Sequence, residues 1–151
     1  MNGKTIAAAA PVIIAALSIA ACKESDPYSG DRQRCVDEIN VYRATLDLAP
    51  YERWREMENC SDEEARHDSE VGIYHDAFGS CDEWAQNECP GWWSIDSIID
   101  GCLADMWAEG PGAFDEGHGH FLNMSSTSYT EVACGFYETP DGSIWSVQNF
   151  R

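Results

Sequence analysis

Basic side chains are scarce in this chain of 151 residues, which carries 27 Asp and Glu against 9 Lys and Arg and has a formal net charge of −18. Affinity for nucleic acids comes mainly from Lys and Arg side chains that neutralise phosphates. The charge therefore argues against direct binding to DNA or RNA. It also opposes adsorption to anionic membrane surfaces, so any contact with a membrane must come from a separate anchor.

Several motifs with a defined chemistry are also missing. The sequence has no Cys-x-x-Cys pair, no His-Glu-x-x-His, no Gly-x-Ser-x-Gly and no glycine-rich phosphate loop. These absences argue against a thiolate zinc site, the common zinc protease and serine hydrolase arrangements, and nucleotide binding. The length permits one domain, and 44% apolar with 11% aromatic residues suffices for a packed core.

The longest uncharged apolar stretch, residues 6–21, is shorter than the ~20 residues that span a bilayer as a helix. It follows one positive charge at Lys4, is rich in alanine and ends in small residues, as secretory signal peptides do. The alternative is a buried N-terminal helix. The order of charge, apolar stretch and small residues favours a signal peptide over residues 1–21.

The end of this segment, Ile19-Ala20-Ala21-Cys22, resembles a bacterial lipobox, in which the cysteine is lipidated and becomes the first residue of the mature chain. We therefore expect a lipid anchor on Cys22, a polar tether over residues 22–30 and a folded domain over residues 31–151. Such a protein would be exported and held at the cell envelope or cell surface, with the lipid as its only membrane contact.

Removing Cys22 from the seven cysteines leaves an even number in an exported chain. Three disulfides are the natural expectation in an oxidising compartment, and the sequence alone leaves 15 pairings open. The expected disulfide cysteines are Cys35, Cys60, Cys81, Cys89, Cys102 and Cys134.

Apolar spacing predicts helices in the first two thirds of the chain. Residues 31–46 carry apolar side chains at helical intervals until Pro50, and residues 94–107 form a regular apolar stripe. Ser61 and Glu64 have the spacing of a capping box, which predicts a helix that begins at Ser61.

The last third changes to the alternating pattern of strands. Residues 132–137 and 144–150 flank a Pro-Asp-Gly turn and predict a β-hairpin. Helices early and strands late indicate an α+β domain with an antiparallel sheet flanked by helices.

The candidate chemical site lies among the histidines. His118 and His120 lie in a six-residue segment with two acids and two glycines, and such a loop can hold a metal. Zinc could be bound by His75, Glu109 and His120 if the fold brings them together. The alternative is a polar cleft without a metal, in which these side chains bind one another and the backbone.

The order of motifs resembles the superfamily of cysteine-rich secretory proteins, antigen 5 and pathogenesis-related 1 proteins, the CAP domain. The resemblance runs from about Cys35 to Phe150 and implies a three-layer α-β-α sandwich. Its matching segments are Asn40-Val41-Tyr42-Arg43, Leu48-Ala49-Pro50, His75, Gln86-Asn87, Trp107-Ala108-Glu109, Gly119-His120-Phe121-Leu122-Asn123-Met124, Val132-Ala133-Cys134-Gly135 and Asn149-Phe150.

The family typically lines a central cleft with two His and two Glu. The resemblance carries these positions to His75, His120 and Glu109, but the fourth falls on Gln86. A glutamine accepts an imidazole N–H but supplies no charge, so we expect weaker zinc binding than with a glutamate there. His118 is a substitute ligand in this interpretation.

The resemblance implies a binding module for a sterol-like or other lipid, an envelope component or a protein, and it does not require catalysis. The alternative is a zinc-assisted hydrolase that uses His75, Glu109 and His120. A third interpretation is an envelope spacer with a vestigial cleft.

The lipobox gives a direct prediction. Cys22→Ala should move the protein from the membrane fraction to the soluble fraction, because it removes the site of acylation. Immunoblots of fractionated cells measure this distribution, and an unchanged membrane-bound fraction would contradict the lipid anchor.

Overall fold

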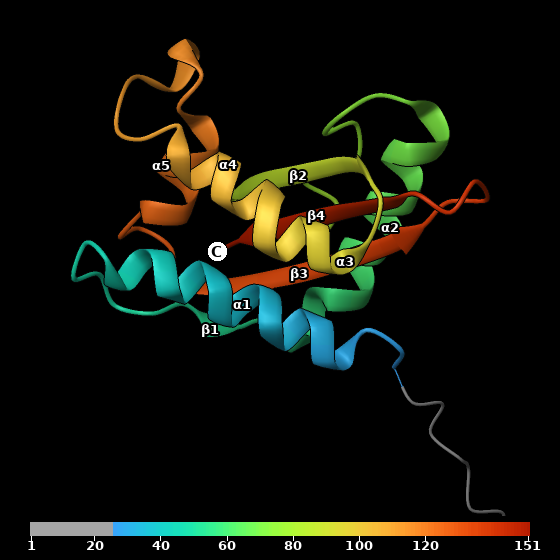
Figure 1. Cartoon of the computed structure of the whole chain (residues 1–151), viewed down its shortest axis with the longest axis horizontal. Helices are drawn as coiled ribbons and strands as arrows, with labels where there is room; N and C mark the ends of the chain where they lie inside the picture. Colours follow the sequence, from blue (N-terminus) through green and yellow to red (C-terminus); the bar gives the residue numbers. More distant parts are fainter. Residues whose placement is uncertain (1–25) are drawn as a thin grey trace, which may run out of the picture.

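The computed structural model describes residues 26–151 and folds them into three layers. One helix, α2, covers one face of a central sheet, and the remaining helices cover the other face (Figure 1). This arrangement confirms the expected α-β-α sandwich. The elements are α1 (Ser29–Ala44), β1 (Glu52–Arg53), η1 (Arg55–Met57), α2 (Glu58–Val71), β2 (Ala85–Trp92), α3 (Ile95–Ser97), η2 (Ile98–Cys102), α4 (Leu103–Ala108), η3 (Phe114–Glu116), α5 (Gly119–Ser125), β3 (Glu131–Glu138) and β4 (Ile144–Phe150).

The sheet has the strand order β1-β3-β4-β2. The predicted hairpin is confirmed as β3 and β4, and β2 pairs antiparallel with β4 as an outer strand. The short strand β1 departs from the expected antiparallel sheet, because it runs parallel to β3. The sequence pattern does not predict β2, since its side chains are largely polar and show no alternation.

The first helix begins at Ser29, inside the segment that we expected to be the tether. Just before it, the Asp26 carboxylate lies 2.7 Å from the buried guanidinium of Arg32. The predicted signal peptide and Cys22 lie outside the described residues. Within the described residues, no helix has the length and apolar character to cross a bilayer.

The apolar stripe over residues 94–107 is confirmed as a helical segment made of α3, η2 and α4. Ser94 and Ser97 form a capping box at its start. In its middle, Ile98–Cys102 forms a π turn rather than regular α-helix. Gly101 in this turn packs against Trp92 so closely that a Cβ would lie 2.9 Å from the indole ring.

The predicted capping box at Ser61 is wrong. Helix α2 begins three residues earlier, at Glu58, and the Ser61 hydroxyl donates to the carbonyl of Met57 at 2.9 Å. Glu64 is buried at the interface between α2 and the sheet. Serine and glutamate at this spacing serve here as buried polar contacts and not as a cap.

The six expected cysteines form three disulfides, and each disulfide ties a helical segment to another layer or loop. Cys35–Cys134 joins α1 to β3, Cys60–Cys81 joins α2 to the loop before β2, and Cys89–Cys102 joins β2 to η2. The sequence separations of 99, 21 and 13 residues mean that the first closes by far the largest loop. These covalent links supplement a small core.

The backbone of helix α2 lies directly against the sheet at Gly135 of β3. A Cβ on Gly135 would lie 2.3 Å from the carbonyl carbon of Ser61 and 2.5 Å from the amide nitrogen of Asp62. Both are backbone atoms, so they cannot move aside as a flexible side chain can. Glycine at this position therefore sets the distance between α2 and the sheet.

Gly135→Ala should lower the free energy of unfolding by about 2 kcal/mol or more, because the added methyl group forces the helix and the strand apart. Urea denaturation of the disulfide-intact protein measures this effect. Gly30→Ala is the matched control, since Gly30 lies in α1 with no atom within 4 Å of an added Cβ. Equal stability of the two variants would contradict the close contact.

Candidate functional site

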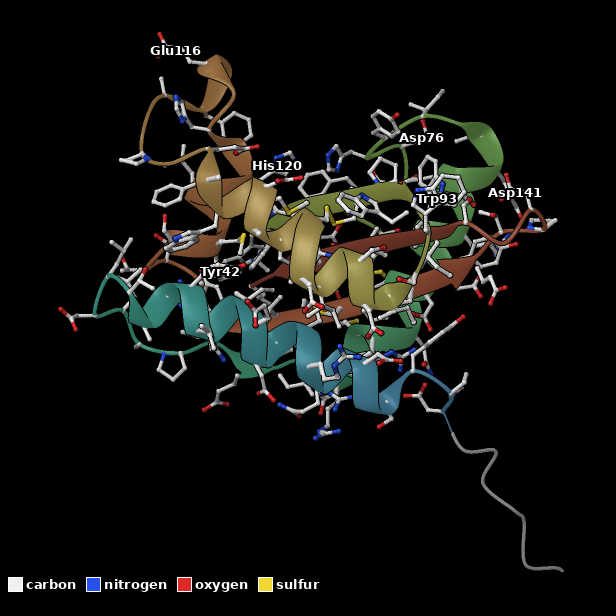
Figure 2. All side chains as sticks on the ribbon, viewed as in Figure 1. Tyr42, Asp76, Trp93, Glu116, His120 and Asp141 are labelled. Atoms are coloured by element: carbon white, nitrogen blue, oxygen red, sulfur yellow. A yellow bond between two sulfur atoms is a disulfide. The ribbon has the colours of Figure 1, made fainter. Side chains whose placement is uncertain are left out.

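The candidate site lies at the outer edge of the sheet, beside the first residues of β2. A cavity of about 310 Å³ opens there between the α2–β2 loop, η3 and the start of α5. Figure 2 shows His120 and Asp76 on the same side of the molecule, beyond β2. The cavity is lined by His75, Gln86, Glu109, Phe114, Gly117, Gly119, His120 and Asn123.

Glu109 fixes the position of His120 through hydrogen bonds to its ring and its backbone. One carboxylate oxygen accepts the Nδ1–H of His120, and the other accepts the backbone N–H of His120 at 3.0 Å and of Phe121 at 3.2 Å. A carboxylate only accepts hydrogen bonds, so the His120 ring carries its proton on Nδ1. This leaves Nε2 as the ring atom available to a ligand.

Gln86 plays the same part for His75. The Oε1 atom of Gln86 lies 2.7 Å from Nδ1 of His75, and the Gln86 side chain is buried while the imidazole is partly exposed. The amide oxygen accepts the Nδ1–H, so His75 also keeps Nε2 free. The two imidazoles thus line one cavity in the same tautomer, one behind a carboxylate and one behind an amide.

The backbone of His75 adopts φ +59°, a left-handed conformation that is uncommon outside glycine. The buried carboxylate of Glu88 accepts the His75 N–H at 2.9 Å, and Asp68 of α2 accepts the N–H of Ala77 at 2.9 Å. Two buried acids therefore fix the loop that carries His75.

The three predicted zinc ligands do not form a three-ligand site. Among the described residues, His75, Glu109 and His120 do not bring three ligand atoms within 4.8 Å of one another. Both Glu109 oxygens accept hydrogen bonds from N–H groups of His120 and Phe121. The available donor set is two imidazole nitrogens, which fits zinc in atom type but lacks the third protein ligand of a catalytic site.

His118, the predicted substitute ligand, lies outside the cavity lining. Its Nδ1 is 2.6 Å from the carbonyl oxygen of Glu109 and 3.0 Å from that of Gly110. Its ring packs on Gly112, where a Cβ would lie 2.1 Å from the imidazole. His118 therefore shapes the loop before α5, and this arrangement does not favour the hydrolase interpretation.

A second, larger cavity of about 580 Å³ continues from the first and shares His75, Gln86, Phe114 and Asn123 with it. Its walls are mostly apolar and aromatic, and several of these rings are exposed to solvent. Sequence reasoning missed this half of the site, because its residues come from four separate segments. Its further lining residues are Phe78, Trp84, Ala85, Leu122, Ser126 and Tyr129.

The fold and the site together define the class of protein: a disulfide-linked three-layer sandwich with a paired-histidine cleft at the sheet edge. The cysteine-rich secretory protein family, CAP, matches residues 36–150. This match covers most of the chain, so the protein belongs to the CAP family. Family and disulfides together indicate an extracellular or surface protein.

Solved structures show the same fold. An outer surface protein from Borrelia burgdorferi is 17% identical with a TM-score of 0.59, over 83% of this chain and 94% of that chain. BmVAL-1 is 14% identical with a TM-score of 0.65, over 85% and 80%. Schistosoma mansoni venom allergen-like protein 4 is 12% identical with a TM-score of 0.57, over 81% and 88%. Among curated proteins, none matches the chain significantly.

The buried acids make stability depend on pH. Burial, with a smaller contribution from the neighbouring charges of Asp68 and Glu64, raises the pKa of Glu88 to about 7, although the hydrogen bond from the His75 N–H lowers it. A carboxyl group whose pKa is higher in the folded than in the unfolded state binds more protons when folded. Its ionisation therefore destabilises the fold as the pH rises from about 4.5 to 7, and the cost levels off above that range.

Glu88→Gln should flatten this dependence, with a difference of the order of 2 kcal/mol between the pH 5 and pH 8 stabilities lost from the profile. Urea denaturation across this pH range measures the effect. Glu63→Gln is the control, because Glu63 is exposed on α2. A profile that keeps its slope in Glu88→Gln would show that Glu88 titrates normally.

Proposed function

We propose that this protein is an exported, lipid-anchored CAP domain that binds a small amphipathic molecule with an apolar body, such as a lipid or a component of the cell envelope. The observation that carries the proposal is the continuity of the two cavities. An aromatic compartment opens directly onto two imidazoles with free Nε2 atoms.

The larger cavity suits the apolar part of such a ligand. Trp84, Phe78 and Phe114 line it and are 62%, 48% and 69% exposed, so they present apolar surface that a ligand would cover. Binding pockets for small molecules combine such apolar walls with a few polar groups that set orientation.

The smaller cavity suits a polar head. The Nε2 atoms of His75 and His120 accept hydrogen bonds when neutral, so a ligand hydroxyl or amide would donate to them. Protonated imidazoles would instead attract a carboxylate or phosphate. The exposed acids around the domain oppose anionic ligands at neutral pH, so a neutral polar head is favoured.

The proposed location follows from the anchor. A lipid on Cys22 would keep the domain close to a membrane surface, while its acidity would keep it from lying flat on anionic lipids. This placement would let the cleft meet membrane-derived or envelope-derived molecules.

Trp84→Ala should weaken the binding of a dansylated undecanol, a probe with an apolar chain and a neutral hydroxyl head, about tenfold, since a covered indole contributes roughly 1–2 kcal/mol through buried apolar area. Fluorescence titration of the purified, disulfide-intact protein gives the Kd. Trp93→Ala is the matched control, because Trp93 is 89% exposed, follows the last residue of β2 and lines neither cavity.

Two outcomes would contradict the proposal. One is absence of saturable binding to the protein with its natural sequence. The other is an equal loss of affinity in the Trp84 and Trp93 variants, which would locate the bound probe outside the aromatic cavity.

A further inference from the structure

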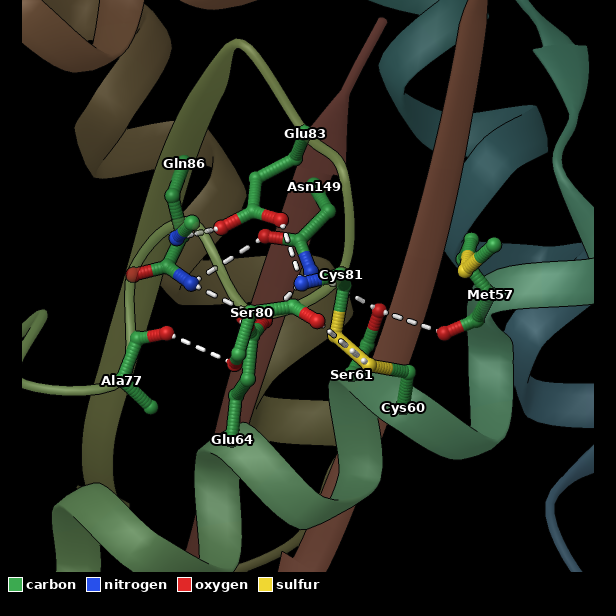
Figure 3. The surroundings of a disulfide bond; sticks show 11 residues. Met57, Cys60, Ser61, Glu64, Ala77, Ser80, Cys81, Glu83, Gln86 and Asn149 are labelled. Carbon is green, nitrogen blue, oxygen red and sulfur yellow. Dashed lines mark hydrogen bonds between the residues drawn. A yellow bond between two sulfur atoms is a disulfide. The ribbon is translucent and has the colours of Figure 1, made fainter.

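Glu64 is a buried acid that does not line the cleft, and the family resemblance gives it no role. It lies on α2, 1% exposed, behind Gln86 and beside the Cys60–Cys81 disulfide (Figure 3). Its Oε2 atom accepts from the side-chain amides of both Gln86 and Asn149. The question is what a buried carboxylate does at this position.

The donor and acceptor roles in the hydrogen bonds around Glu64 can be assigned in sequence, beginning with the backbone carbonyl of Met57. The Ser61 hydroxyl gives its only proton to the Met57 carbonyl at 2.9 Å, so its oxygen accepts from the neighbouring Asn149 amide at 3.0 Å. Asn149 therefore points its NH₂ group towards Ser61 and Glu64. Its Oδ1 is left facing Gln86.

The same logic fixes the next amide. Gln86 Nε2 lies 3.1 Å from Glu64 Oε2 and 3.1 Å from Asn149 Oδ1, and both of these atoms accept. Both N–H bonds of Gln86 are thus used inside the fold. Its Oε1 must face His75, 2.7 Å from Nδ1.

We propose that Glu64 acts with Asn149 as a positioning residue of the His75 side of the cleft. By accepting from Gln86 and Asn149, it turns the Gln86 oxygen towards His75 and holds that imidazole with its proton on Nδ1 and Nε2 free for a ligand. The assignment rests on the proposed binding function, since a fixed tautomer matters only where Nε2 meets a ligand. Glu64 is thus the acid that position 86 lacks, placed one residue further from the cleft.

This arrangement does not depend on the charge state of Glu64. Its second oxygen, Oε1, lies 2.9 Å from the Ser80 hydroxyl, on the other side of the carboxyl group. A proton on Oε1 would leave Oε2 as an acceptor for both amides. The direction of the hydrogen bonds is therefore the same in either state.

The assignment changes what a glutamate at position 86 would do. Gln86→Glu would replace a donor to Glu64 by a carboxyl oxygen at about the same place, in a buried site that already holds the Glu83 carboxyl group beside Glu64. Two buried carboxylates in contact repel each other, or one must hold a proton. Replacing Glu64 by glutamine at the same time removes the repulsion between these two carboxylates.

The first test is the tautomer of His75 in the ligand-free protein, read from its imidazole ¹⁵N chemical shifts at a pH where the ring is neutral. The unaltered protein should show a protonated Nδ1. Glu64→Ala should lower the ratio of Nδ1–H to Nε2–H at least fivefold, because Gln86 loses one of its two acceptors and Asn149 loses the carboxylate that holds its NH₂ group. Glu64→Gln should keep the ratio, since its carbonyl can take the place of Oε2.

His120 is the internal control, because its proton is held by Glu109 and not by Gln86. An unchanged His75 tautomer in a folded Glu64→Ala protein would overturn the proposal. So would a loss in Glu64→Gln as large as in Glu64→Ala. Both readouts are made without a ligand, so a failure of probe binding leaves this test intact.

A second test does not require Glu64→Ala to fold. In urea denaturation at pH 8, Gln86→Glu should lower the folding equilibrium constant about tenfold or more, and Glu64→Gln/Gln86→Glu should raise it at least threefold above that of Gln86→Glu, the rest of the loss coming from the Asn149 oxygen that position 86 no longer pairs. With Glu64→Gln as the fourth corner of the cycle, additive effects would show that the two side chains do not interact and would overturn the proposal.

Discussion

The contact between α2 and the sheet at Gly135 is the constraint on which the site depends. Because position 135 has no side chain, the backbone of Ser61 and Asp62 lies directly on β3. That depth brings Ser61 and Glu64 within hydrogen-bond distance of Asn149 on β4. A helix held further out would leave buried amides of the sheet without partners, at a cost that exceeds the worth of an ordinary hydrogen bond.

The order of the strands then carries this effect to the surface. β4 is the neighbour of β2, and Asn149 pairs with Gln86 in the register of the two strands. Since paired residues point to the same face, the two amides meet beneath α2, and β2 has no further strand beyond it among the described residues. The polar interior of the α2 layer thus reaches the sheet edge at Gln86, beside His75.

The other half of the cleft is built from the opposite layer. Asn123 of α5 donates to the Gln86 carbonyl at 3.2 Å and to the Asn87 side chain at 2.9 Å, which docks α5 on β2. Glu109, at the end of α4, caps the same helix and holds His120. The two imidazoles therefore come from opposite sides of the sheet and are positioned by independent contacts.

The sequence predicted the elements that have a local apolar pattern, and it did not predict those that depend on buried polar contacts. The α1 stripe, the helical segment from Ser94 and the hairpin follow from apolar periodicity, and they are present. β2 was missed because its buried side chains are polar, and burial between two layers leaves no alternating pattern. The resemblance predicted that His75, Gln86, Glu109 and His120 share a cleft, and in the structure all four line one cavity. The spacing of Ser61 and Glu64 predicted a helix cap. The sequence cannot separate a capping glutamate from a buried one, because the same side chain serves in both roles.

The glutamine at position 86 illustrates the limit of comparing residue types alone. Considered alone, Gln86 leaves His75 without the acid that the resemblance predicts beside it. Its surroundings show a carboxyl group one amide further from the cleft. Burial and the neighbouring Glu83 raise the pKa of Glu64, and Ser80 and Asn149 donate hydrogen bonds to it. His75 needs a group that accepts the hydrogen bond from its Nδ1–H. A neutral amide can do this if its oxygen is held facing the ring. Fixing that direction requires acceptors for both of its N–H bonds, which Glu64 and Asn149 supply. A set of oriented dipoles therefore stands where the resemblance predicts an acid, and the cleft carries one charge fewer.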